Sequence, residues 1–168
     1  MLNCTSDEEI NGCMPDRNLL IIYHSQSGST EKMARASLEG GSDSEISGID
    51  IRFLEANLAT EDDLLWADGL IIGTAEHFGY MSGGLKDFFD RTFYKVENKI
   101  QPLSCAILIS AENDGTGALT SIRRIVKGYP FVEVQEPIIS RGPLEDDTLK
   151  KCLDLGTAIS AGLEAGIY

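Results

Sequence analysis

Short apolar runs alternate with longer amphipathic stretches along most of this 168-residue chain. Runs such as 69–74 are almost continuously apolar, which is typical of strands buried on both faces. In stretches such as 83–98 the apolar residues recur three and four positions apart, which is typical of helices. The pattern predicts strands over 18–24, 50–55, 69–74, 103–110 and 131–139. It predicts helices over 29–41, 60–68, 83–98, 117–128 and 144–168.

Each predicted strand leads into a helix, and the connections are too long for hairpins. This order predicts an α/β fold with a five-stranded parallel sheet and helices on both faces. Five strands are too few for an eight-stranded barrel and fit a doubly wound sheet of order 2-1-3-4-5. Pro137 interrupts the last strand, which predicts a bulge or an edge position there. Residues 1–17 are polar without periodicity, so we expect a loose N-terminal extension before a domain over 18–168.

The formal charge of −13 argues against binding to nucleic acid or anionic lipid. It fits either a basic protein partner or simple solubility. No apolar stretch reaches the length of a membrane helix, and the acidic start is unlike a secretory signal. The four cysteines are Cys4, Cys13, Cys105 and Cys152, and their spacing is not that of metal ligands. We therefore expect no metal site. We also expect a reduced, cytoplasmic protein.

Three unusual loops follow the first, third and fourth predicted strands. We call them loop one (25–30), loop two (74–82) and loop three (110–117). In a doubly wound sheet these loops lie together at the carboxyl ends of the strands, where ligands bind. Their coincidence predicts a binding site at this edge.

Loop one joins a buried strand to a helix start and carries three serines and one threonine. Hydroxyls, backbone amides and a helix N-terminus can bind a phosphate without any cation. The loop has neither the GxxxxGK nor the GxGxxG pattern. By itself, it could also be an ordinary turn that caps a helix.

Loops two and three carry the other candidate chemistry. Phe78 and Tyr80 could pack against a flat ring, although Phe78 could instead fold into the core. His77 could contact a ligand or simply be solvated. In loop three, two glycines allow close approach of the backbone to a ligand, or the loop could be a plain helix start capped by Asp114.

The three loops together resemble flavodoxin-like FMN proteins, and most closely the WrbA-type NAD(P)H:quinone oxidoreductases. Loop one with its strand end reads YHSQSGST over 23–30, like that family's phosphate loop. The more specific match, over 67–92, is ADGLIIGTAEHFGYMSGGLKDFFDRT, and the third is DGTG over 114–117. The resemblance covers about residues 18–165 and implies a flavodoxin-like fold.

It also implies FMN as cofactor and NAD(P)H as possible co-substrate. The FMN phosphate would lie on loop one, at Ser25, Gln26, Ser27, Gly28, Ser29 and Thr30. The isoalloxazine ring would lie against parts of loops two and three: Thr74, Ala75, Glu76, His77, Phe78, Gly79, Ser110, Ala111, Glu112, Asn113, Asp114, Gly115 and Gly117.

The chain departs from the family at several points. Ala75 stands where the family has Pro, and His77 where a basic residue is common. The long insertions that help the quinone reductases form tetramers are absent. The resemblance therefore does not decide whether this chain forms a homo-oligomer. Loop three has no aromatic residue to cover a flavin, so we expect one flavin face to be open.

Three functions are compatible with these features. The first is an FMN-dependent oxidoreductase that transfers electrons from NAD(P)H to a quinone-like acceptor, with His77 or Tyr80 as proton donor. The second is a flavodoxin-type carrier that passes single electrons between redox protein partners. The third is a binding module that uses FMN structurally or as a sensor.

Overall fold

The computed structural model describes residues 17–168. Arg17, expected to end the N-terminal extension, is the first residue of strand β1. The rest of the predicted extension lies outside the described residues. No helix within 17–168 is long and apolar enough to cross a membrane.

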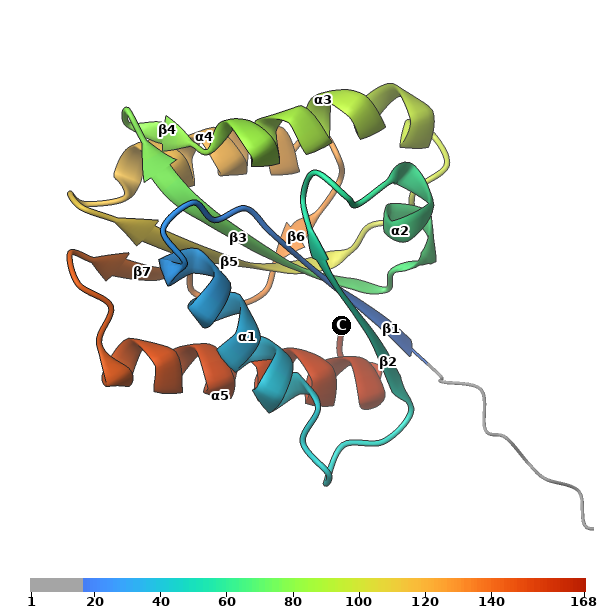
Figure 1. The fold of residues 1–168 in the computed structure, drawn as a ribbon. Helices are drawn as coiled ribbons and strands as arrows, with labels where there is room; N and C mark the ends of the chain where they lie inside the picture. The colour runs from blue at the N-terminus through green and yellow to red at the C-terminus, as the bar shows by residue number, and fades with distance from the viewer. Residues whose placement is uncertain (1–16) are drawn as a thin grey trace, which may run out of the picture.

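The centre of the fold is a parallel sheet of order β2-β1-β3-β5-β6, with β7 also paired to β5 (Figure 1). Its strands are β1 (Arg17–Tyr23), β2 (Ile49–Glu55), β3 (Gly69–His77), β5 (Ser104–Ala111), β6 (Val132–Glu133) and β7 (Ile138–Arg141). The short β6 pairs with the start of β5, and β7 pairs with its end. They are two pieces of the predicted fifth strand, which ends at Glu133 and resumes at Ile138, directly after Pro137. The predicted order 2-1-3-4-5 is therefore confirmed.

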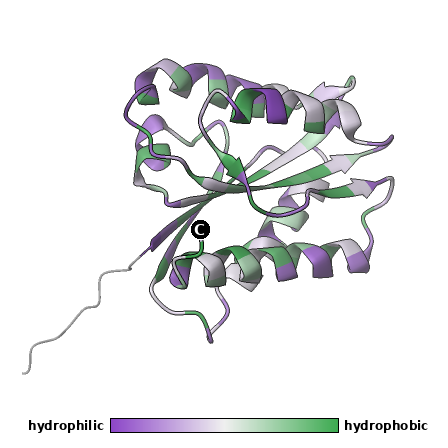
Figure 2. Ribbon diagram, turned by 180° about the vertical axis from the view of Figure 1, so that it is seen from behind, coloured by the Kyte–Doolittle hydropathy of each residue, from purple (hydrophilic) through white to green (hydrophobic). Residues whose placement is uncertain are grey.

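Helices cover both faces of the sheet. They are α1 (Ser29–Gly41), α2 (Glu61–Trp66), α3 (Gly83–Val96), α4 (Thr116–Val126) and α5 (Asp146–Glu164). Figure 1 shows α1 and α5 on one face and α3 and α4 on the other. The apolar sides of helices and strands face each other, as the colouring of Figure 2 shows.

Alternate residues of the central strands supply two separate cores. In β1, Leu20 and Ile22 join the cluster under α3 and α4, whereas Leu19 and Ile21 join the cluster under α1 and α5. All four are fully buried. This is why the strands read as continuous apolar runs in the sequence.

One connection is a hairpin, contrary to expectation. β3 continues beyond Thr74 to His77 and pairs antiparallel with β4 (Tyr80–Met81). The intervening Phe78 and Gly79 have φ of 53° and 69°. Two positive φ angles give the turn twist that matches paired strands. The sequence signal was weak because Phe is unusual at such a position.

Candidate functional site

The three loops meet at the carboxyl ends of the parallel strands, on the left in Figure 1. A cavity of about 120 Å³ opens there. Its walls come from loop one, the β3–β4 hairpin, the end of β5 and the turn after β7: Ser27, Ser29, Ala75, Glu76, His77, Ser110, Ala111, Glu112 and Gly142. The structure thus brings together predicted residues of all three loops.

Loop one leads directly into an uncapped helix. The Gly28 amide donates to the Ser25 hydroxyl at 3.0 Å, and Gly28 has φ of 92°, which glycine adopts without strain. No side chain caps the N-terminus of α1. The first amides of a helix have no partner within the helix and carry the positive end of its dipole. The start of α1 therefore offers donors to an anion.

The start of α4 contrasts with that of α1. Asp114 Oδ1 accepts hydrogen bonds from the Thr116 amide at 3.0 Å and from its hydroxyl at 2.8 Å. These bonds, and to a smaller extent the charge of Arg141, lower the pKa of Asp114. Glu76 Oε2 accepts a bond of 2.9 Å from the Ala118 amide. Two carboxylates of the chain itself thus occupy the place that an anion would take on α4.

A partly buried hydroxyl pair fixes loop one to the end of β5. Thr30 Oγ1 and Ser110 Oγ share a hydrogen bond of 2.7 Å. Thr30 is only 1% exposed. The Thr30 side chain therefore supports the site from its buried side. Its hydroxyl already has a hydrogen-bond partner within the protein.

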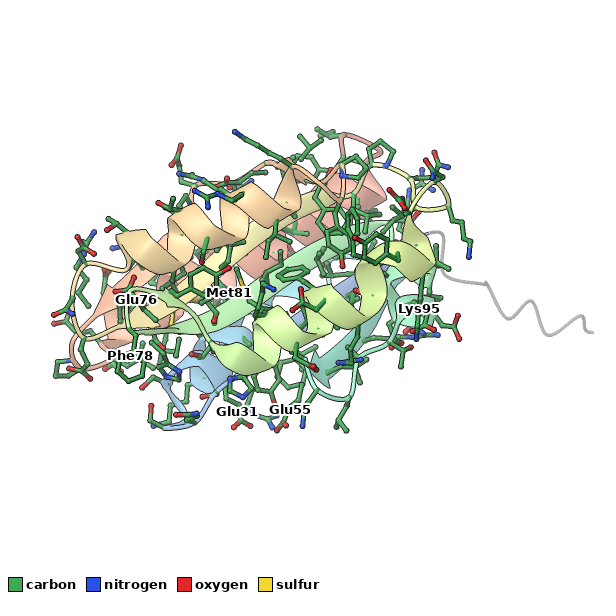
Figure 3. All side chains as sticks on the ribbon, turned by 90° about the horizontal axis from the view of Figure 1, so that it is seen from above. Glu31, Glu55, Glu76, Phe78, Met81 and Lys95 are labelled. Atoms are coloured by element: carbon green, nitrogen blue, oxygen red, sulfur yellow. The ribbon has the colours of Figure 1, made fainter. Side chains whose placement is uncertain are left out.

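The hairpin is docked on α4 by three contacts. The Glu76 carboxylate binds the Ala118 amide, and the Met81 amide donates to the Ser121 hydroxyl at 3.2 Å. A Cβ atom on Gly117 would overlap the carbonyl group of Gly79, so the two backbones are in direct contact. Glu76 and Met81 are labelled in Figure 3, where Met81 lies between α3 and α4. The hairpin is therefore a preformed wall of the site.

Two residues that are predicted to contact the cofactor also support the hairpin. Thr74 is fully buried, and the Ser82 amide donates to its hydroxyl at 3.0 Å. Gly117 faces Gly79. Thr74 lies buried behind the hairpin and Gly117 packs against its turn, so both support the hairpin, and their contact with a ligand stays a prediction.

The aromatic residue at the hairpin tip is fully exposed. Phe78 has a relative exposure of 108% and stands at the outer end of the hairpin in Figure 3. The alternative that it folds into the core is wrong. A bulky residue with positive φ costs about 1–3 kcal/mol and persists where the surroundings hold it. His77 and Tyr80 are directly opposed in the hairpin ladder, so their side chains leave the same face of the ribbon.

The other predicted residues of the three loops do not line the cavity: Ser25, Gln26, Gly28, Gly79, Asn113, Asp114 and Gly115. Gly142, which does line it, was missed. Its loop follows β7, and the carboxyl end of every parallel strand in this sheet lies at the same edge. That topology was a usable signal for Gly142.

The donor set fits FMN. Loop one supplies hydroxyls and amides without a cation, which suits a phosphate at a helix start. Pockets for drug-sized ligands have volumes of about 300–1,000 Å³, so a flavin would extend beyond this cavity and along the hairpin. No group of three or more residues of metal-ligating type gathers anywhere in 17–168. Burial raises the pKa of both Cys105 and Cys152 to about 12, so neither is a reactive thiolate.

Comparison with known proteins agrees with this description. The family model for NADPH-dependent FMN reductase matches residues 18–141. The chain therefore belongs to this family, and it is a flavodoxin-like FMN protein.

Individual relatives carry two kinds of name. A flavodoxin of Aquifex aeolicus is 40% identical over 117 residues, which is 68% of this chain and 62% of that protein. An NAD(P)H dehydrogenase (quinone) of Acidithiobacillus ferrooxidans is 35% identical over 94 residues, 44% of this chain and 46% of that protein. The matches thus span less than two thirds of these relatives. A WrbA-like flavodoxin structure from Agrobacterium tumefaciens superposes with a TM-score of 0.69 at 19% identity, covering 86% of this chain and 96% of that one.

Proposed function

We propose that the chain holds FMN across the three loops. The phosphate binds the hydroxyls of Ser25, Ser27 and Ser29 and the amides at the start of α1. The ring lies along the hairpin, with the backbone of Ala111 and Glu112 at its other edge. The uncapped start of α1 supports this placement, because the corresponding amides of α4 are already occupied.

We further propose that the protein transfers electrons from NAD(P)H to a quinone-like acceptor. When bound, FMN accepts a hydride from NAD(P)H and passes two electrons to the acceptor. The observation that carries this proposal is the open side of the site. Loop three contains no aromatic residue, and Phe78 is fully exposed beside the cavity. A planar donor or acceptor can therefore approach from solvent.

The chain itself supplies groups for orientation and proton transfer. A quinone that gains two electrons also takes up two protons. The Tyr80 hydroxyl and a ring nitrogen of His77 leave the same face of the hairpin, where they can pass protons from solvent to the acceptor oxygen. Backbone amides at the end of β5 can donate to the electron-rich edge of the ring.

A one-electron carrier is the second candidate. The 40% identity to the Aquifex flavodoxin and the charge of −13 favour it, because acidic surfaces attract basic protein partners. The two buried thiols, Cys105 and Cys152, are unbridged and fit the reducing cytoplasm that we propose for either function.

Turnover with purified protein distinguishes the candidates. The protein is loaded with FMN, mixed with NADH or NADPH and benzoquinone, and followed by the absorbance of the reduced nicotinamide. Rapid oxidation that depends on benzoquinone is the expected result. The result that favours the carrier over the reductase is an absence of turnover together with two well-separated one-electron potentials of the flavin in a redox titration.

A further inference from the structure

A second hollow lies beside the candidate site, between the hairpin and α4. Gly79 and Tyr80 form one wall and α4 forms the other, around a cavity of about 300 Å³. A neighbouring cavity of about 250 Å³ lies between α3 and α4, and Arg124 lines both. We call the two cavities together the α4 groove. It begins beside Phe78, so a ligand at the flavin face could extend into it.

Arg124 is the cation of this groove that no other group engages. Four arginines of the described chain pair with carboxylates: Arg35, Arg52, Arg91 and Arg123. The side chain of Arg124 is exposed, and no ion pair or hydrogen bond joins it to another residue of 17–168. The chain has a net charge of −13, so carboxylates are plentiful. A guanidinium near the candidate site that pairs with none of those within 17–168 is therefore unusual. It is positioned to bind an anion.

The neighbours of Arg124 suit a phosphate joined to an aromatic group. Thr120 precedes it by four residues, so its hydroxyl lies on the same face of α4. Tyr80 is 43% exposed and offers a ring edge or face. Lys86 of α3 lines the second cavity and adds positive charge, although Asp90 pairs with it at 2.6 Å. Guanidinium and hydroxyl groups donate together to phosphate oxygens.

We propose that the α4 groove anchors the phosphate-bearing part of the nicotinamide dinucleotide donor, through Arg124 and Thr120. This inference rests on the proposed reductase function. Gly117 touches Gly79 at the hairpin, and Arg124 lies seven residues further along α4, about 10 Å by the helical rise. The nicotinamide ring can thus lie at the open flavin face while the diphosphate or the 2′-phosphate reaches Arg124.

Arg124→Gln tests the anchor, and Arg123→Gln is its matched control. Arg123 is adjacent on the same helix but turned toward Glu133, at 2.7 Å. The affinity of each FMN-loaded variant for NADP⁺ and for NAD⁺ is measured by calorimetry at low and high salt. We expect Arg124→Gln to raise the dissociation constant about tenfold and to reduce its salt dependence, because one charge-assisted contact is lost. Arg123→Gln should leave both unchanged.

Kinetics give a second readout. In Arg124→Gln the KM for the donor should rise while kcat and the FMN content stay unchanged. A rise for NADPH alone assigns the contact to the 2′-phosphate, and an equal rise for NADPH and NADH assigns it to the diphosphate. Unchanged affinity in Arg124→Gln, with normal turnover in the parent protein, overturns the anchor only. A parent protein that neither binds nor oxidises either dinucleotide overturns the reductase function and the anchor with it.

Discussion

The carboxylate of Glu76 accepts a hydrogen bond of 2.9 Å from the backbone amide of Ala118. The bond joins the hairpin to the first turn of α4 across 42 residues of sequence. This hydrogen bond gives a partner to a helix amide that has none within the helix, and it also fixes the wall of the site. The position of the hairpin is thus set before any ligand binds.

Replacing Glu76 should loosen this wall. Glu76→Ala removes the acceptor, and we expect a loss of about 1 kcal/mol in the free energy of unfolding, as for other helix caps. FMN affinity should fall as well. Urea unfolding and FMN titration measure the two effects. Glu76→Gln keeps an oxygen acceptor and serves as control; equal loss in both variants would show that the negative charge matters more than the bond.

The contact of Gly117 with Gly79 should tolerate no side chain. Gly117→Ala places a methyl group against the Gly79 carbonyl, so the hairpin must move. We expect a loss of about 1–3 kcal/mol, typical of overpacking, and weaker FMN binding. Gly83→Ala is the control, since open space surrounds Gly83 at the start of α3. If both variants bind FMN like the parent, the docked hairpin is not needed for the site.

The hydroxyl pair of Thr30 and Ser110 should be needed for stability. Thr30→Val keeps the shape but leaves the Ser110 hydroxyl without its partner at 2.7 Å. We expect a loss of about 1–3 kcal/mol in chemical denaturation. Thr30→Ser retains the hydroxyl and should recover most of the loss. No difference between the Val and Ser variants would contradict a role for the hydrogen bond.

The loop before α4 should make stability depend on acidity. Hydrogen bonds from Thr116 hold the pKa of Asp114 below its ordinary value of 3.8. A lowered folded-state pKa stabilises the protein above the ordinary pKa, and this contribution is lost as pH falls through the lowered one. The stability difference between the parent and Asp114→Asn, measured by denaturation across pH, should therefore shrink at acid pH. A difference that stays constant would contradict this account.

The strands and the layers of the fold were predictable because β1, β3 and β5 contain nearly continuous apolar runs. A strand that is buried on both faces needs apolar side chains on both sides. The hairpin was not predictable. Glu76, in the polar end of β3, is held by the Ala118 amide of α4, and Phe78 and Gly79 are not a common turn pair. Tertiary contacts thus decided the local structure there.

The meeting of the three loops at one edge of the sheet was predictable, whereas the contacts within the candidate site were only partly so. The sequence placed three loops at one edge, and the cavity lies among them. It could not reveal that the Thr30 hydroxyl and Thr74 would be engaged inside the protein, since those partners, Ser110 and Ser82, are chosen by packing. No sequence motif pointed to Arg124. What distinguishes it is that its side chain has no ion-pair partner within the described residues, and this can be seen only in the folded chain.

Comparison of FMN with riboflavin tests the central claim most directly. The two flavins share the ring and differ in the phosphate that loop one should hold. We expect the purified apoprotein to bind FMN at least about 100-fold more tightly than riboflavin, measured by quenching of flavin fluorescence, because the proposed site would give the phosphate several charge-assisted hydrogen bonds. Equal affinity for the two flavins, or no uptake of FMN, would contradict the assignment of the site.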